Sequence, residues 1–272
     1  MDTTAITRDT LLCTSLAARP SNVGTRFHNW LYRELGLDFV YKASRTDDLA
    51  GAIAGVRALG IRGCGVSMPF KQDVIALLDS VDEAAAAIGA VNTVVNTEGQ
   101  LHGYNTDYLS VRGLLEPLPV RGGFVVLGSG GMARAVLAAL HGLGWSDGTV
   151  FARNEGAGRA LAQQYGYHWQ PALGKDRPAL LVNATPIGMA GGSEADRLPV
   201  DAAVVEAATT VVDVVGFPAE TPLVRVARDR GTQVVTGAEI QELQAVEQFA
   251  LYTGVRPGPD VVRRATSFAR SE

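Results

Sequence analysis

Gly128-Ser129-Gly130-Gly131-Met132-Ala133 decides the fold, because it follows a short apolar run, Phe124–Leu127, and opens an amphipathic one, Ala133–Leu143. This is the GxGxxA pattern of dinucleotide-binding turns in its required strand–turn–helix setting. Gly128 permits the tight turn, Gly130 lets the backbone approach a pyrophosphate, and Ala133 allows close packing of helix on strand. N–H groups at the helix start would bind the phosphates. We therefore predict a dinucleotide site; the alternative is a plain glycine-rich β–α turn.

The residue at the end of the next strand selects the cofactor. NAD sites usually place an acidic side chain there, which binds the ribose 2′-hydroxyl and repels a 2′-phosphate. Here Arg153, followed by Asn154, ends the apolar run Thr149–Ala152, and an arginine can hold a phosphate through paired N–H bonds. The sequence therefore predicts NADP (NADPH), bound by Arg153 and Asn154, and disfavours NAD. Two alternatives stay open: Glu155 could bind a ribose hydroxyl instead, or Arg153 could be an ordinary surface residue.

Short apolar runs alternate with longer helical patterns along the chain, which is typical of βαβ units. In the second half the runs are continuously apolar rather than alternating, which favours a parallel sheet covered on both faces. The strands predicted there are 124–127, 149–152, 179–183, 211–215 and 233–235, and those of the first half are 10–13, 39–42, 61–67 and 90–95. Helices are predicted over 26–35, 47–59, 133–143, 240–252 and 260–268.

These patterns predict an α/β protein with two domains. Residues 1–104 would form an α/β substrate-binding domain, and residues 105–237 a Rossmann-type, doubly wound NADP-binding domain. The last residues, 238–272, are expected to pack as helices on the first domain. Because no flexible linker marks the boundary, we expect ordered connections and a ligand-binding cleft between the domains.

The composition excludes several classes of protein. Of 272 residues, 47% are hydrophobic and 19% charged, which is typical of a folded chain and not of a disordered one. The formal net charge of −4 gives no electrostatic reason to expect nucleic acid or an anionic membrane as a partner. Neither a secretory signal nor an apolar run of membrane-spanning length is visible. Because Cys13 and Cys64 both lie in apolar runs, we expect buried thiols and a cytoplasmic protein.

Polar residues also occur in the first half where a core would not need them. The segments are Ser67-Met68-Pro69-Phe70-Lys71, Ala90-Val91-Asn92-Thr93 and Gly103-Tyr104-Asn105-Thr106-Asp107. Each has an ordinary explanation by itself. Lys71 could be a solvated residue, Asn92 a hydrogen-bonded core amide, and Asn105 or Asp107 a helix N-cap.

Together with the glycine turn, these segments resemble the shikimate dehydrogenase family over nearly the whole chain. Residues 68–71 match the family's T-x-P-x-K, 89–93 its GAVNT, 103–107 its G-x-N-T-D, 183–189 its NATSxGM, 213–222 its DxVYxPxxTP, and 244–254 its QAxxxFxxxTG. Six motifs in the same order and at matching spacing make the resemblance specific.

The resemblance implies a role for each matching residue. Lys71 and Asp107 would be the catalytic pair, in which the ammonium stabilises the developing alkoxide and the carboxylate orients it. The substrate would be bound by Asn22, Ser67, Asn92 and Gln244, and the cofactor by Thr185, Met189, Val214 and Gly237 together with the glycine turn. The implied activity is the reversible, NADP-dependent conversion of shikimate, or a related cyclic hydroxy acid, to its ketone. In the family this reaction belongs to the chorismate pathway of aromatic amino acid biosynthesis.

The sequence departs from the family at the substrate carboxylate. The family's Ser-x-Ser-Pro segment, whose serines hold that carboxylate, is represented by Asn22, Gly24 and Thr25. Gly65 and Gly216 stand where the family has an asparagine and a tyrosine. Each lost hydroxyl donor should weaken carboxylate binding by roughly 1.5–3 kcal/mol.

The replacing residues could form a different clamp, for which Arg19, Ser21, Asn22 and Thr25 are the candidates. The pattern of 15–22 resembles the divergent shikimate dehydrogenase-like branch of the family. Two alternative functions follow: a quinate- or aminoshikimate-type dehydrogenase, or an NADP-binding regulatory module with little turnover. The four histidines lack ligand spacing, so no metal is predicted. We expect a monomer or homodimer.

Overall fold

The computed structural model describes residues 6–18, 20–67, 69–118, 122–173 and 177–271. Arg19 and Met68, expected in the clamp and in the lysine segment, lie outside these residues, as do the first residues of the chain. One compact unit comprises Met1–Thr106 and Glu242–Glu272, and the other comprises Asp107–Gln241. The division falls within two helices, α4 (Thr106–Leu115) and α9 (Gly237–Thr253).

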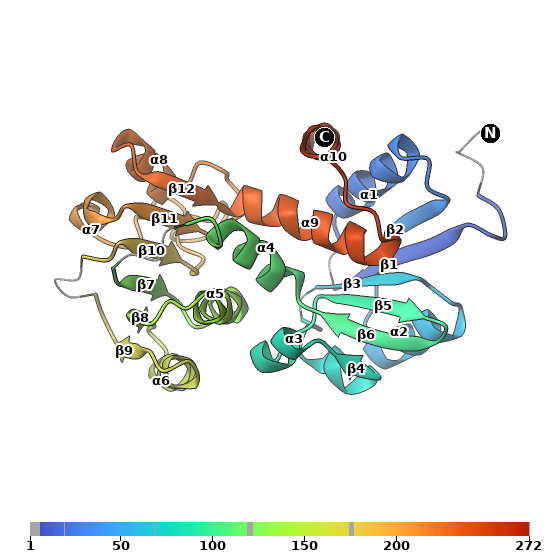
Figure 1. The fold of residues 1–272 in the computed structure, drawn as a ribbon, viewed down its shortest axis with the longest axis horizontal. Helices are drawn as coiled ribbons and strands as arrows, with labels where there is room; N and C mark the ends of the chain where they lie inside the picture. Colours follow the sequence, from blue (N-terminus) through green and yellow to red (C-terminus); the bar gives the residue numbers. More distant parts are fainter. Residues whose placement is uncertain (1–5, 19, 68, 119–121, 174–176, 272) are drawn as a thin grey trace. The chain divides into compact units, whose positions relative to one another are not determined.

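The second unit contains a six-stranded, fully parallel sheet with strand order β12-β11-β10-β7-β8-β9 (Figure 1). Its strands are β7 (Phe124–Leu127), β8 (Gly148–Phe151), β9 (His168–Gln170), β10 (Leu180–Asn183), β11 (Thr210–Asp213) and β12 (Gln233–Thr236). Numbered from β7, this is the order 3-2-1-4-5-6 of the Rossmann fold. The predicted doubly wound architecture is confirmed.

Both faces of this sheet are buried. Phe124 and Val126 belong to one hydrophobic cluster, and Val125 and Leu127 belong to another. Because successive side chains of a strand point to opposite faces, one continuous apolar run supplies both clusters. Helix α5 (Gly131–Gly142) packs in the first cluster, and α7 (Ala202–Ala207) and α8 (Pro222–Asp229) pack in the second; α6 (Glu155–Gln164) lies between β8 and β9 in the chain.

The sheet of the first unit is mixed, with strand order β2-β1-β3-β5-β6-β4. Its strands are β1 (Leu11–Ala17), β2 (Phe39–Arg45), β3 (Gly63–Val66), β4 (Ser80–Val81), β5 (Thr93–Thr97) and β6 (Gln100–Tyr104). β2 and β3 are parallel to β1, whereas β5 is antiparallel to both β3 and β6. The helices are α1 (Asn22–Glu34), α2 (Leu49–Ala58), α3 (Glu83–Ile88) and α10 (Pro259–Arg270), with a 3-10 turn at Asp73–Leu77.

The β5–β6 hairpin differs from the sequence-based prediction, which had the first strand without its partner. Strand β6 alternates, with Leu101 and Gly103 buried and His102 and Tyr104 half-buried, so it presents no continuous apolar run. Glu98 and Gly99, at the two turn positions, have φ values of 53° and 85°. Two consecutive positive φ values are the mark of a type I′ turn, whose twist suits a hairpin.

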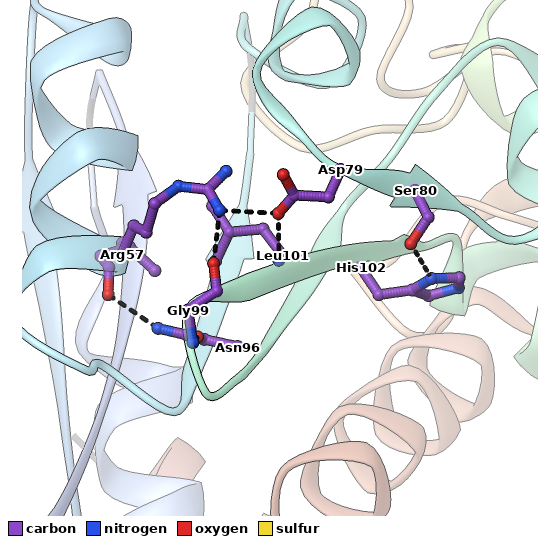
Figure 2. A network of polar contacts seen from close by, with 8 residues as sticks. Arg57, Asp79, Ser80, Asn96, Gly99, Leu101 and His102 are labelled. Carbon is purple, nitrogen blue, oxygen red and sulfur yellow. Dashed lines mark hydrogen bonds and ion pairs between the residues drawn. The ribbon is translucent and has the colours of Figure 1, made fainter.

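A hydrogen-bonded network ties this hairpin to its surroundings (Figure 2). The Arg57 guanidinium donates to the Asp79 carboxylate at 2.7 Å and also to the Gly99 carbonyl oxygen in the turn. Asp79 further accepts the amide N–H of Leu101 at 2.6 Å. The bond from Arg57, followed by that from Leu101, lowers the pKa of Asp79. The network fixes the outer end of a hairpin whose first strand begins directly after Asn92.

Candidate functional site

A pocket of about 650 Å³ lies at the carboxyl ends of β7, β8 and β10 in the Rossmann unit. It is formed by the glycine turn, by the residues after β8 and β10, by further loop residues, and by Val204 of α7. The lining residues are 127–130, 151–154, 171–173, 184–187, Glu194, Arg197, 199–201 and Val204. The strand order reverses between β7 and β10, and α/β sheets bind ligands at such a reversal.

The two glycines that begin the turn have different surroundings. Gly128 has a φ of 109°, and a Cβ there would lie 2.7 Å from the carbonyl oxygen of Ala184, so glycine is required. At Gly130 a Cβ would meet no heavy atom of the described residues within 4 Å. Gly130 is the N-cap of α5, whose first N–H groups have no partner within the helix. Open space beside N–H donors fits a pyrophosphate.

Three charged side chains meet in this pocket. The Arg153 guanidinium lies 3.7 Å from the Glu194 carboxylate, and Arg197 donates to the same carboxylate at 2.6 Å. Glu155, the acid that the sequence suggested for the ribose, instead pairs with Arg159 on α6 at 2.8 Å and does not line the pocket. Glu194 and Arg197 were not predicted, because their loop carries no periodic pattern and no recognisable motif.

A buried polar network holds the loop after β10. The Asn183 amide donates to Asp213 at 3.0 Å and to the Ile187 carbonyl oxygen at 3.1 Å, while its own oxygen accepts the Thr185 hydroxyl at 2.6 Å. Asp213 also accepts the Thr221 hydroxyl at 2.6 Å. Burial raises the pKa of Asp213, and its hydrogen bonds oppose that shift. The network thereby fixes Thr185 in the pocket lining.

The remaining residues predicted for the cofactor lie outside this lining; they are Gly131, Met132, Ala133, Met189, Val214 and Gly237. Ala133 is fully buried in the core between helix and sheet, as its predicted packing role requires. Gly237 packs on the backbone of the residues after β11, since a Cβ there would lie 2.2 Å from the Val215 carbonyl oxygen. The side chain of Met189 is exposed.

In the first unit, hydrogen bonds donated by backbone amides connect the predicted substrate segments. The Val91 amide donates to the Lys71 carbonyl oxygen at 2.8 Å, which joins the lysine segment to the residue before Asn92. The Thr106 amide donates to Asn92 Oδ1 at 2.8 Å. Lys71, Asn92 and Thr106 are therefore held close to one another. Asp107 directly follows Thr106, is buried, and is the first residue of the second unit.

The orientation of the Asn92 amide is fixed by its partners. Oδ1 accepts the backbone N–H of Thr106, which can only donate, and the hydroxyls of Thr93 and Thr106. Nδ2 is buried and has no hydrogen-bond partner among the described residues. An unpaired buried donor costs about 1–3 kcal/mol, so a ligand oxygen bound there would be favoured.

Gln248 is a residue that the sequence patterns did not identify. Its Nε2 donates to the Thr93 hydroxyl at 3.0 Å and to the Asn92 carbonyl oxygen at 3.3 Å. The same nitrogen lies 3.5 Å from where a Cβ at Gly65 would be. Gln244, predicted to bind substrate, is half-buried one helical turn earlier on α9. Residues four apart share a helix face, and this spacing could have identified Gln248.

The start of α1 stands where the family has its carboxylate clamp. Asn22 is the exposed first residue of the helix. The Gly24 carbonyl oxygen accepts the ring N–H of His28 at 2.9 Å, and the Thr25 hydroxyl accepts the Ala43 amide at 3.1 Å. These two clamp positions therefore take part in packing within the unit.

Four further positions of the substrate prediction can be placed in the structure. Ser67 is exposed directly after β3, and Lys71 is half-buried. At Gly216, a Cβ would lie 1.8 Å from Nε2 of Gln241. Because neither Gly65 nor Gly216 has a positive φ, the residue type at these positions reflects the side chains beside them and not the backbone conformation.

Cys13 and Cys64 are buried, free thiols, and burial raises their pKa to about 11 and about 12. They therefore stay protonated at neutral pH. Among the described residues no cluster of three metal-ligating side chains occurs. Within the same residues, no helix has both the length and the apolar character needed to cross a membrane.

Comparisons with known proteins give a consistent result. A family model described as the shikimate dehydrogenase substrate binding domain matches residues 22–94. A shikimate dehydrogenase-like protein of Haemophilus influenzae is 48% identical over 269 residues, which cover 98% of this chain and 99% of that protein. The solved structure of a shikimate 5-dehydrogenase-like protein superposes with a TM-score of 0.96 at 48% identity, covering 98% of this chain and 100% of the other. Shikimate 5-dehydrogenase of Thermus thermophilus, solved with NADP(H) and shikimate, gives a TM-score of 0.85 at 34% identity, covering 95% and 99%.

Proposed function

The chain belongs to the shikimate dehydrogenase family, in its divergent shikimate dehydrogenase-like branch, and we propose that it interconverts a cyclic hydroxy acid and its ketone with NADP as cofactor. Shikimate and 3-dehydroshikimate are the substrate pair that we expect. The observation that carries the proposal is the pocket of the Rossmann unit, in which the open space at Gly130 and the guanidinium of Arg153 border one cavity. A dinucleotide with a 2′-phosphate needs both features.

The nicotinamide ring, when bound, supplies the hydride acceptor for the carbon that carries the substrate hydroxyl. The protein has to remove the hydroxyl proton as that hydride leaves. We assign this step to Lys71 and Asp107: the lysine amine accepts the proton, its ammonium stabilises the alkoxide, and the Asp107 carboxylate orients the lysine. In the reverse direction the ammonium returns the proton to the ketone oxygen.

Asn92 is the residue to which we assign recognition of a ring hydroxyl. Its Oδ1 is occupied by donors of the protein, so only Nδ2 remains to donate to a ligand. Gln244, on the same helix face as Gln248, would bind a second hydroxyl. Uncharged amides suit hydroxyl groups because they can both donate and accept.

The proposal is tested by following NADPH oxidation with 3-dehydroshikimate, and NADP⁺ reduction with shikimate, at the nicotinamide absorbance. Lys71→Ala should reduce kcat by at least about 10²-fold, the usual contribution of a general acid–base group. Cofactor affinity, measured separately by fluorescence titration, should stay unchanged. Absence of turnover with shikimate, 3-dehydroshikimate, quinate and an amino-substituted analogue, together with intact NADPH binding, would contradict the enzymatic proposal and support a regulatory NADP-binding module.

A second candidate keeps the chemistry and changes the substrate, as in a quinate- or aminoshikimate-type dehydrogenase. The observation that favours it is the altered clamp, where Gly24 and Thr25 take part in packing within the unit. The ratio of kcat/KM values for shikimate, quinate and an amino-substituted analogue separates the two candidates, since that ratio measures specificity.

A further inference from the structure

The cofactor pocket contains a carboxylate between two arginines. Glu194 is paired through Oε2 with Arg153 at 3.7 Å and through Oε1 with Arg197 at 2.6 Å. The two arginine side chains are 79% and 67% exposed, whereas that of Glu194 is only 22% exposed. The anion is thus the fixed member of the group, and both cations can reorient toward a ligand.

The backbone holds this group next to the cofactor loop. The Gly188 amide donates to the Glu194 carbonyl oxygen at 3.0 Å, and the Arg197 amide donates to the same oxygen at 3.2 Å. Gly188 follows the segment 184–187, which lines the pocket. Glu194 and Arg197 therefore move with the loop that the Asn183–Asp213 network anchors, while Arg153 belongs to the segment after β8.

The charges of the group suit a phosphate better than a single carboxylate. A phosphate monoester carries close to two negative charges and three acceptor oxygens at neutral pH, which two guanidiniums can match. A carboxylate carries one negative charge, which neutralises only half of the positive charge of two arginines. A 2′-phosphate entering the pocket would take over both arginines, and the Glu194 carboxylate, left without its two partners, would oppose the phosphate by like-charge repulsion.

We propose that Arg197 is a second ligand of the cofactor's 2′-phosphate, and that Glu194 competes with that phosphate for both arginines. Glu194 thereby reduces the preference for a 2′-phosphate over a 2′-hydroxyl. The inference rests on the proposed NADP dependence and adds the residues that set its strength. Of the two proposed phosphate ligands, Arg153 follows β8, and Arg197 lies in the loop that follows β10.

The proposal is tested by calorimetric titration with two fragments, adenosine 2′,5′-bisphosphate and adenosine 5′-monophosphate, which differ only in the 2′-phosphate. Arg197→Gln should weaken binding of the bisphosphate about tenfold, the loss expected for one charge-assisted contact, and leave the monophosphate unchanged. Glu194→Gln should tighten the bisphosphate several-fold. Arg153→Gln measures how much bisphosphate binding weakens when the first arginine is lost, and the effect of Arg197→Gln is compared with that loss.

Matched controls come from an exposed ion pair of the same unit that does not line the pocket, Arg230 with Glu206 at 2.7 Å. Arg230→Gln and Glu206→Gln should bind both fragments like the unmodified protein. All substituted residues except Glu194 are exposed, and unfolding midpoints verify that each variant folds.

The outcomes separate this inference from the proposed function. If the unmodified protein binds neither NADP⁺ nor the bisphosphate, the proposed cofactor is wrong. If Arg153→Gln weakens the bisphosphate and Arg197→Gln does not, NADP dependence stands and the role of Arg197 is refuted. Weaker bisphosphate binding by Glu194→Gln would show that Glu194 positions the arginines and does not compete for them.

Discussion

Gly128 and Ala184 are in such close contact that a Cβ at Gly128 would lie 2.7 Å from the Ala184 carbonyl oxygen. The contact joins the glycine turn after β7 to the loop after β10, and both segments line the pocket of the Rossmann unit. Both partners are backbone, so neither can rotate away. The positive φ of Gly128 adds a second constraint on the same residue.

Gly128→Ala should therefore destabilise the protein by about 3 kcal/mol, since a left-handed backbone and a steric overlap each cost about 1–3 kcal/mol. Urea unfolding measures the change. Gly130→Ala is the matched control, because its Cβ would meet nothing within 4 Å in the described part of the chain. That variant should keep its stability within about 1 kcal/mol and lose affinity for NADPH. Equal destabilisation of the two variants would refute the assignment of separate roles.

The buried carboxylate of Asp213 should be essential for the loop after β10. Asp213→Ala removes the acceptor of the Asn183 amide, the Thr221 hydroxyl and the Val215 amide. Leaving such donors unpaired costs about 1–3 kcal/mol each, so we expect a loss of several kcal/mol in the free energy of unfolding.

Asp213→Asn is the informative companion, because it keeps one oxygen acceptor and the Thr221 hydroxyl can reverse its role. It should lose much less stability than Asp213→Ala. A small loss in Asp213→Ala, measured by urea unfolding, would show that the network is dispensable.

His28 should make stability depend on pH in the mildly acidic range. Burial lowers the pKa of His28 from 6.5 to about 4, although the hydrogen bond to Gly24 opposes this shift. Below pH 6.5 the unfolded chain binds a proton that the folded protein does not, so stability falls as pH decreases from about 6.5 to about 4. The full effect of His28 is about 3 kcal/mol.

Unfolding measured across this window for the unmodified protein and for His28→Gln isolates the contribution of the histidine, since other groups titrate equally in both. Over this pH range the free energy of unfolding of His28→Gln should fall by about 3 kcal/mol less than that of the unmodified protein. His168→Gln, at an exposed position of β9, should keep the original slope. Parallel curves for the unmodified protein and His28→Gln would contradict the buried, neutral state of His28.

Gln248 should act as a positioning residue for Asn92. Gln248→Leu removes the donor to Thr93 and to the Asn92 carbonyl oxygen, so the Asn92 amide loses part of its support. We expect KM for the ring substrate to rise about tenfold, the equivalent of one net hydrogen bond, while kcat changes little. Gln248→Glu has a side chain of the same length as glutamine. It should reverse less than half of the rise in KM, because a carboxylate cannot donate a hydrogen bond.

Gln100→Leu is the matched control, because Gln100 is an exposed amide on β6 of the same unit. Its KM should equal that of the unmodified protein. A fall in kcat for Gln248→Leu at constant KM would contradict a role in substrate positioning.

Five of the six strands of the Rossmann unit, all but β9, could be predicted because their signal is local. Phe124–Leu127 is continuously apolar and matches β7 at both ends, and the glycine pattern directly after it fixes the turn. Helix α6 (Glu155–Gln164) was missed because it contains two glycines and few apolar residues. Strand β6 was missed because only one face of it is buried.

The sequence by itself determined the α/β class, the dinucleotide turn and the family, because each depends on residue types at short, fixed spacings. It also identified Arg153 and Asn92 as residues that suit a phosphate and a hydroxyl. Only the tertiary structure decided that Glu194 and Arg197 share a pocket with Arg153, and that Gln248 holds the backbone of Asn92. These contacts join segments far apart in the chain, and no local pattern records which side chains folding brings together.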